Sequence, residues 1–355
     1  MNISRGCLLF MKILLLYDNS GPKYHRCILP IVYMPGVEFV NAHTITEELC
    51  QDIDILFFNR IIMNTTIEDV LKLRDKYGFK IVVDFDDDWH LTPDHYLYNI
   101  YQETRASEIM QQWVGDADAV TVTHDRLAQK VYPLNKNVHV LPNAIPKEGQ
   151  FLAKKIPSDV TRLFWAGGVT HAKDIELLRG PVQRLQGLPV QMVMGGYMKG
   201  SPEHQRMASA YTNGGKMPNE LLESLPVSDY YYMYSKCDIA LVPLKDTVFN
   251  QNKSNLKILE AANIGANVIV SNVHPYKDFP HVNYVDTSSD WYKWVKWLLG
   301  NKEAAIEQSI LLQNYVDEKF NFGKINKKRY EIFQSLCNHT TKHPLKVSET
   351  FTTPG

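Results

Sequence analysis

The stretch NQNKSNLKILEAANIG (250–265) joins a polar loop to an amphipathic helix that a glycine ends. The apolar run ANVIVSN (266–272) follows at once and has the length and β-branched content of a buried strand. Ser254 is a residue type that caps helix starts, and Gly265 is the type that ends helices. A helix that leads directly into a buried strand is typical of parallel sheets covered by helices.

Units of the same kind fill the chain on both sides of this stretch. Apolar runs alternate with helix-length amphipathic segments, and the first series contains six expected strands, enough for one Rossmann-like domain. A second series follows a polar segment and predicts another such domain. The expected strands are residues 12–17, 37–41, 53–59, 80–85, 118–123 and 138–143, then 162–168, 189–196, 237–244 and 266–272. The sequence therefore predicts an α/β protein with two Rossmann-like, doubly wound domains that face each other across a cleft.

The same pattern suggests where the chain divides. We expect an N-terminal appendage, a first domain, a polar linker, a second domain, C-terminal helices and a flexible tail, over residues 1–10, 11–146, 147–159, 160–300, 301–337 and 338–355. Ligands of parallel sheets bind beyond the carboxyl ends of the strands, so the cleft is where binding residues are expected.

Charge and composition exclude several classes of function. Lysine plus arginine number 38 and aspartate plus glutamate 39, so no overall field attracts nucleic acid or anionic lipid. The five cysteines are scattered without a C-x-x-C pair, which indicates neither a zinc site nor a disulfide framework and suggests the cytoplasm. No run approaches the roughly 20 apolar residues of a membrane span, so no integral membrane association is expected.

Two segments of the second domain suggest an anion site. In WAGGVTHAKD (165–174), Gly167 and Gly168 permit close approach of backbone to a ligand, and the following helix start with Lys173 favours an anion. The alternative is an ordinary strand-to-helix turn with a solvated lysine.

The opening stretch adds a second group of candidate ligands. Lys253 and Lys257 suit a diphosphate, and Glu260 can accept hydrogen bonds from ribose hydroxyls. The alternative is that Lys257 and Glu260 form an ordinary surface pair at i, i+3.

These segments together resemble a known family. The runs RLFWAGGVTHAKD, CDIALVPL and FNQNKSNLKILEAANIGANVIVSNVHPY resemble the C-terminal half of retaining nucleotide-sugar glycosyltransferases of the GT-B, group-1 (family-4-like) type. DADAVTVTHDRLAQKV and VHVLPNAIP extend the resemblance over most of residues 11–340. The family pattern has two acids eight positions apart, followed by A-x-x-x-G-x-x-V-I-x-S. Glu260 matches the second acid, whereas Asn252 occupies the position of the first.

The resemblance implies roles for these residues. It makes the first domain the acceptor domain and the second the nucleotide-sugar domain, with a nucleotide-diphosphate sugar such as a UDP-sugar as co-substrate and no obligatory metal or other cofactor. Glu260 would bind ribose, Lys173 and Lys253 the diphosphate, and Asn252 the sugar hydroxyls. The predicted donor-binding set is Gly167, Gly168, His171, Lys173, Asn252, Lys253, Ser254, Lys257 and Glu260.

Residues after the first expected strand suggest the acceptor side. In YDNSGPKYHRCILP (17–30), Gly21 supplies a turn, and Tyr24, His25 and Arg26 offer an aromatic face, a titrating group and an anion clamp. The alternative is a helix start with exposed polar residues.

The acidic run DFDDDWH (84–90) follows the fourth expected strand. It has three interpretations: a divalent metal site, an acceptor-binding or electrostatic site, or helix capping. Alignment with the family places Asp86 where these enzymes usually have a histidine. We take Asp86, Asp87, Asp88 and His90 as the candidate catalytic residues, hold His95 in reserve and expect no metal.

The function predicted from these observations is transfer of a sugar from a nucleotide-diphosphate sugar to an acceptor hydroxyl with retention of configuration. The segments SGPKYHR and DFDDDW resemble bacteriophage-encoded members, whose acceptors include hydroxymethylated DNA bases and glycans. This resemblance implies a protein that acts in a host cytoplasm and a function in DNA modification. Two alternatives stay open: a non-catalytic nucleotide-sugar or glycan-binding protein, and a metal-dependent phosphohydrolase that uses the Asp84–Asp88 cluster. The sequence gives no prediction of oligomeric state.

Overall fold

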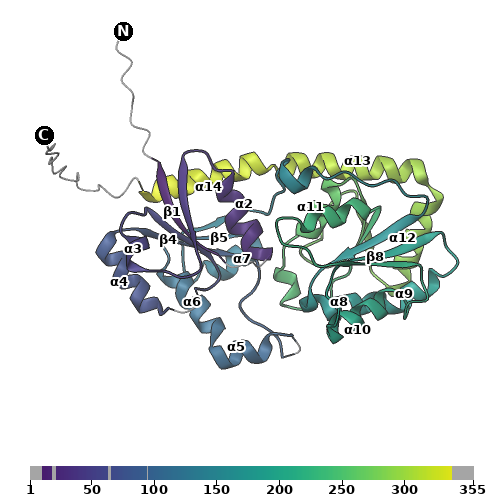
Figure 1. Cartoon of the computed structure of the whole chain (residues 1–355), viewed down its shortest axis with the longest axis horizontal. Coiled ribbons are helices and arrows are strands. Elements are labelled where there is room, and N and C mark those ends of the chain that lie inside the picture. The colour runs from purple at the N-terminus through teal and green to yellow at the C-terminus, as the bar shows by residue number, and fades with distance from the viewer. Residues whose placement is uncertain (1–9, 18–20, 63–64, 94, 338–355) are drawn as a thin grey trace, which may run out of the picture.

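The computed structural model describes residues 10–17, 21–62, 65–93 and 95–337. They form two lobes side by side, each built on one parallel sheet (Figure 1). The expected appendage, apart from Phe10, and the expected tail lie outside the described residues.

The sheet of the first lobe has the strand order β2-β1-β3-β4-β5-β6, with every pair parallel. All six expected strands are confirmed, as β1 (Met11–Leu16), β2 (Val37–Ala42), β3 (Ile55–Asn59), β4 (Lys80–Phe85), β5 (Ala119–Val122) and β6 (Val138–Val140). The central strands β3 and β5 are buried along their whole length, because helices cover both faces of the sheet.

The second sheet is also parallel and six-stranded, in the order β12-β11-β10-β7-β8-β9. Its members are β7 (Thr161–Ala166), β8 (Val190–Tyr197), β9 (Asn219–Glu223), β10 (Ile239–Val242), β11 (Asn267–Ser271) and β12 (Asn283–Val285). The sequence predicted the four central strands and missed β9 and β12. Both missed strands lie at the edges of the sheet, and β9 is half-exposed and carries two glutamates, so it lacks the apolar run of a buried strand.

The helices cover the two sheets. In the first lobe they are α1 (Gly21–Lys23), the π-helical turn η1 (Tyr24–Ile28), α2 (Leu29–Val32), α3 (Glu47–Cys50), α4 (Ile67–Tyr77), α5 (Tyr98–Thr104), α6 (Ala106–Asp116) and α7 (Asp125–Val131). After the short turn η2 (Gly149–Leu152), the second lobe has η3 (Val169–His171), α8 (Ala172–Ile175), η4 (Glu176–Leu178), α9 (Arg179–Arg184), α10 (Pro202–Tyr211), η5 (Tyr230–Lys236), η6 (Asn250–Asn252), α11 (Leu256–Asn263), α12 (Ser288–Gly300) and α13 (Lys302–Lys319).

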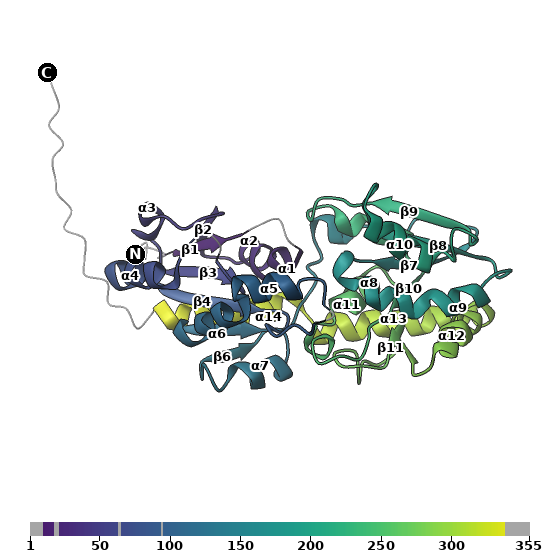
Figure 2. The same ribbon diagram turned by 90° about the horizontal axis from the view of Figure 1, so that it is seen from below.

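The last two helices join the lobes. Helix α13 packs on α11 and β11 of the second lobe, whereas α14 (Phe322–Cys337) returns to the first, where Phe333 is fully buried with its ring centroid 5.2 Å from that of Phe57. Both views show α13 and α14 running one after the other along the two lobes (Figure 1, Figure 2). Among the described residues, no helix is long and apolar enough to cross a membrane.

Candidate functional site

A cavity of about 740 Å³ opens between the lobes, a size in the range of small-molecule sites, which is roughly 300–1,000 Å³. The first lobe contributes residues from the loops after β1, β4 and β6, and the second lobe from those after β7, β8 and β9 and from η5 and α11. The strands of parallel sheets place their following loops at one edge, and the two edges meet here.

The glycine turn after β7 forms one wall of the cavity. A Cβ atom at Gly167 would lie 2.9 Å from Cζ2 of Trp165 and 3.2 Å from Nζ of Lys257, so this position has no room for a side chain. A Cβ at Gly168 would meet nothing within 4 Å. The Lys257 ammonium donates to the Ala166 carbonyl beside the same turn.

The start of α11 forms the adjacent wall. The prediction that Ser254 caps this helix was wrong: the N-cap residue is Asn255, and the Ser254 hydroxyl accepts instead from Asn143 Nδ2 of the first lobe at 2.9 Å. Lys253 precedes the helix in extended conformation, with Nζ 3.7 Å from Asp87 Oδ2. Ser254, Lys253 and Lys257 all line the cavity. Burial lowers the pKa of Lys257.

Glu260 lies on α11 with its carboxylate buried at the cavity wall. The Tyr230 hydroxyl donates to Oε1, and the Tyr234 hydroxyl donates to Oε2 at 2.6 Å. Burial raises the pKa of Glu260, and the two tyrosine hydroxyls act in the opposite direction. Glu260 is therefore not the solvent-exposed partner of Lys257 that the alternative interpretation required.

His171 also lines the cavity, at the end of η3. Its Nδ1 lies 2.9 Å from Asp174 Oδ2, and burial lowers the pKa of His171 to about 4, so the ring is neutral and Nδ1–H donates to the carboxylate. Its other nitrogen, Nε2, is left as an acceptor. Lys173 lies instead at a smaller neighbouring cavity, together with His95.

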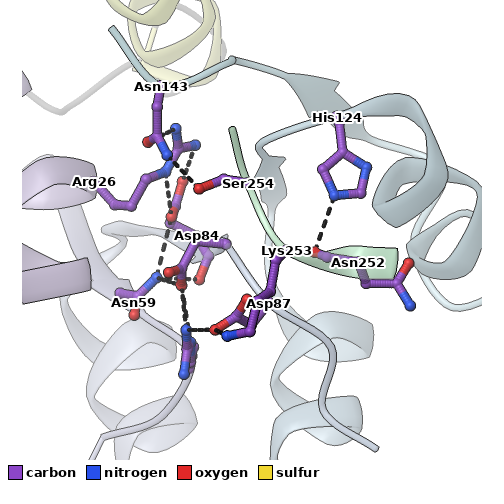
Figure 3. Close-up of polar contacts among 11 residues, drawn as sticks. Arg26, Asn59, Asp84, Asp87, His124, Asn143, Asn252, Lys253 and Ser254 are labelled. Carbon is purple, nitrogen blue, oxygen red and sulfur yellow. Dashed lines mark hydrogen bonds and ion pairs between the residues drawn. The ribbon is translucent and has the colours of Figure 1, made fainter. Parts of the chain in front are cut away.

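The first acid of the run, Asp84, has a structural role. Its carboxylate is fully buried and accepts from Arg26 Nε at 2.9 Å and Nη2 at 2.7 Å, and from Thr121 Oγ1 at 2.6 Å. The remaining Arg26 contacts go to the Leu141 carbonyl and to Asn143. Figure 3 shows Arg26 with Asp84 and Asn143. Arg26, proposed above as an anion clamp, is thus committed to a buried ion pair, although part of it lines the cavity.

The next two acids line the cavity and share one cation. Arg60 Nε donates to Asp86 Oδ1 at 2.8 Å and Nη2 donates to Asp87 Oδ2 at 2.8 Å, while Asn59 Nδ2 also donates to Asp86 at 3.1 Å. Burial acts to raise the pKa of Asp86, but Arg60 and Asn59 outweigh it and the pKa is lowered. The Asp86 carboxylate is therefore ionised. Figure 3 shows the side chain of Lys253 running toward Asp87 from the opposite lobe.

The fourth acid, Asp88, binds across the interface between the lobes. Its buried side chain accepts from the Lys130 ammonium and, through Oδ2, from Asn252 Nδ2 at 2.8 Å. Asn252 Nδ2 also donates to the Val248 carbonyl, and His124 Nε2 lies 3.0 Å from the Asn252 carbonyl oxygen.

This pairing changes the expected role of two residues. Neither Asp88 nor Asn252 is among the described residues that line the cavity, because their side chains face each other. The sugar contact transferred to Asn252 from the family pattern is therefore not what the geometry supports. His90, also proposed as catalytic, has a side chain that is 58% exposed, and it does not line the cavity either.

The acceptor-side candidates divide in the same way. Gly21 and His25 line the cavity, whereas the Tyr24 hydroxyl accepts from Gln150 at 3.2 Å, at a contact between η1 and η2. His25 is buried, with Nε2 2.8 Å from the Tyr230 hydroxyl oxygen. The described residues contain no group of three or more His, Cys, Asp or Glu side chains placed to hold a metal ion.

Sequence reasoning missed several residues of the site. Arg60 directly follows β3, so the rule that loops after parallel strands meet at one edge would have found it. Tyr230 and Tyr234 lie in the run DYYYMYSK, which has no strand or α-helix period and forms the turn η5. No local pattern indicates that these two hydroxyls reach Glu260.

Comparison with solved structures identifies the architecture. HepE of Anabaena in complex with UDP and glucose matches with a TM-score of 0.66 and 13% identity, over 92% of this chain and 100% of that one. A glycosyltransferase from Rickettsia africae matches with a TM-score of 0.64 and 12% identity, over 93% and 100%. The chain has the GT-B fold.

Other solved structures of this fold agree. A structure described as trehalose-6-phosphate from E. coli bound with UDP-2-fluoro glucose matches with a TM-score of 0.62 and 11% identity, over 91% of this chain and 99% of that one. No protein-family model matches the sequence, and no curated protein matches it. At these identities the likeness concerns the fold, and function rests on the site.

Proposed function

We propose that the protein is a glycosyltransferase that moves a sugar from a nucleotide-diphosphate sugar to an acceptor hydroxyl with retention of configuration. The observation that carries this proposal is the convergence of three features on one cavity of the GT-B fold. These are a glycine turn in which Gly167 has no room for a side chain, two lysines at the start of α11, and a buried carboxylate further along that helix. UDP is the nucleotide we propose, because four of the matching structures contain UDP or a UDP-sugar.

The donor would lie along the second lobe. Lys253 and Lys257, with the backbone of the glycine turn, would hold the diphosphate through charge-assisted hydrogen bonds. Glu260 would accept the ribose hydroxyls. A carboxylate offers about four acceptor sites, and the two tyrosines use one on each oxygen, so each oxygen keeps a free site for a hydroxyl.

Catalysis would depend on charge stabilisation. Departure of the diphosphate develops negative charge beside Lys253 and Lys257, and the sugar develops positive charge facing Asp86 and Asp87. In a retaining transfer the departing phosphate oxygen can take the proton of the acceptor hydroxyl, so no carboxylate nucleophile is required.

The acceptor would enter from the first lobe. Its class follows from the sequence resemblance alone: a glycan, or a hydroxymethylated DNA base if the protein acts as bacteriophage-encoded members do, in a host cytoplasm. A phosphohydrolase that uses the whole acidic run is disfavoured, because Asp84 and Asp88 are held in ion pairs with Arg26 and Lys130 and, among the described residues, do not line the cavity. A non-catalytic nucleotide-sugar binder is the second candidate, because Asn252 replaces the first acid of the family pattern and faces away from the cavity.

The test is a transfer assay on the purified protein with a panel of UDP-sugars, glycans and hydroxymethylated DNA, read by mass spectrometry and by release of UDP. NMR of the product reports the anomeric configuration. We expect a product with the configuration of the donor. Binding of UDP-sugar without hydrolysis or transfer would support the non-catalytic candidate, and an inverted product would exclude retention.

A further inference from the structure

His25 reaches the nucleotide-binding acid of the other lobe through one tyrosine. It lies in the turn η1 of the first lobe, and its Nε2 is 2.8 Å from the hydroxyl oxygen of Tyr230 in the second. The Tyr230 hydroxyl donates to Glu260 Oε1, and His25 Nε2 itself is 3.7 Å from that oxygen. A continuous polar chain therefore crosses the interface between the lobes and ends on Glu260.

The direction of the hydrogen bonds along this chain is determined. Burial, followed by the charge of Arg26, lowers the pKa of His25 to about 4, so the imidazole is neutral and carries one N–H. The Tyr230 hydroxyl has one proton, which it gives to the carboxylate, so its oxygen accepts and His25 must donate from Nε2. His25 Nδ1 is then an unprotonated nitrogen, and it has no hydrogen-bond partner among the described residues.

The surroundings of His25 fix its ring. The Tyr24 and Tyr230 rings stand edge-on to it, with centroids 5.5 Å and 5.7 Å away, and its side chain is 5% exposed. A buried imidazole with one unpaired nitrogen destabilises the folded protein. The one hydrogen bond of this ring runs from Nε2 to Tyr230, whose hydroxyl donates to Glu260. The unfavourable burial of His25 therefore indicates a role in the site that acts through Tyr230.

We propose that His25 is a positioning residue that sets the nucleotide affinity of the opposite lobe, by holding Glu260 through Tyr230 in the orientation that accepts the ribose hydroxyls. This inference rests on the proposed function, in which Glu260 binds ribose. Its consequence is that the first lobe, which would bind the acceptor, also controls how tightly the second lobe holds the donor.

The experiment measures the affinity of the full chain for UDP, 2′-deoxy-UDP and 3′-deoxy-UDP by calorimetry, in the wild type and in three variants. His25→Ala removes the donor, His25→Gln restores an N–H near the position of Nε2, and Tyr230→Phe removes the connecting hydroxyl. The matched controls are His139→Ala on β6 and Tyr232→Phe, a neighbour of Tyr230 on η5 whose residue is 49% exposed.

We expect His25→Ala and Tyr230→Phe each to weaken UDP binding about fivefold or more, the lower end of typical coupling between sites. His25→Gln should recover part of this loss, and adding His25→Ala to Tyr230→Phe should change little further. The hydrogen bonds from His25 through Tyr230 to Glu260 would act on the ribose hydroxyls. His25→Ala should therefore weaken the binding of UDP more than the binding of the deoxy analogue that lacks the hydroxyl bound by Glu260.

Two outcomes would overturn the inference: equal weakening of UDP and of both deoxy analogues, or fully additive effects of the two substitutions. Either would show that His25 supports the fold without acting through Tyr230. Failure of the wild type to bind any nucleoside diphosphate would instead reject the proposed function, so the two failures are distinguishable.

Discussion

The contact between Asp88 and Asn252 favours an amide over an acid at residue 252, the position of the first acid in the family pattern. An aspartate at residue 252 would place a second carboxylate against the buried Oδ2 of Asp88, which now accepts from Asn252 Nδ2 at 2.8 Å. We therefore predict that Asn252→Asp, the substitution that restores the family pattern, destabilises the protein.

The magnitude follows from two limits. Two carboxylates about 4 Å apart repel by about 4 kcal/mol at the effective dielectric constant of about 20 that suits protein sites. The two carboxylates can avoid this repulsion by binding one proton. Protonation costs about 1.4 kcal/mol for each pH unit above the ordinary pKa of an aspartate, which is about 4 kcal/mol at pH 7 and about 1.5 kcal/mol at pH 5. Lys130, which donates to the same carboxylate, reduces the penalty, so we expect about 2–4 kcal/mol at pH 7.

The sign of the pH dependence is also determined. The added acid has a folded-state pKa above its unfolded value, so its destabilising effect is present at pH 7 and disappears as the pH falls toward the unfolded pKa. The melting temperature of the variant should lie about 3–5 °C below that of the wild type at pH 7 and approach it at pH 5.

The assay is a thermal melt of wild type and variants at both pH values, with small-angle scattering to detect opening of the lobes. Asn255→Asp, which adds the same charge at the N-cap of α11, is the matched control and should not lower the melting temperature. Asp88→Asn combined with Asn252→Asp should recover part of the loss. The reasoning is refuted if Asn252→Asp changes neither the melting temperature nor the radius of gyration at pH 7.

Three further predictions concern the cavity. Lys253→Ala should weaken UDP binding by about 1.5–3 kcal/mol in calorimetry, and unchanged affinity would remove this lysine from the diphosphate site. Gly167→Ala should lower the melting temperature and the nucleotide affinity, because its Cβ would overlap neighbouring atoms and destabilise the protein by about 1–3 kcal/mol. Gly168→Ala should be close to neutral. Equal effects of the two substitutions would contradict the claim that Gly167 has no room for a side chain. Asp86→Asn and Asp87→Asn should each lower the transfer rate roughly a hundredfold while the affinity for UDP is unchanged. The transfer rate of the wild type should be the same with and without EDTA. Loss of wild-type activity in EDTA and its return with Mg²⁺ or Mn²⁺ would overturn the metal-free mechanism.

The strands were predictable because a parallel sheet covered on both faces leaves uninterrupted apolar runs, as in ILLL (13–16) and ILFF (55–58). The edge strand β9 was not, since its sequence NELLE is half-exposed and has no such run. The general position of the site was predictable from strand ends and from the glycine turn at Gly167.

What each side chain touches in the site was not predictable. Asp84 to Asp88 are similar in sequence, yet one lies in a buried ion pair, two line the cavity and one crosses to the other lobe. These differences come from contacts with residues 26, 60, 130 and 252, which lie 26 to 164 positions away from their partners. The first three contacts follow from packing within the first lobe, and the fourth from the packing of the two lobes. Spacing along the chain carries no information about contacts of this kind.

The central claim, that the cavity between the lobes binds a nucleoside diphosphate along the second lobe, is tested most directly by hydrogen exchange of the full chain with and without UDP. Protection is predicted in peptides that cover residues 166–171 and 253–260, where the glycine turn and the start of α11 would contact the ligand. Absence of protection in both segments at a UDP concentration that saturates binding, or protection elsewhere alone, would contradict the claim.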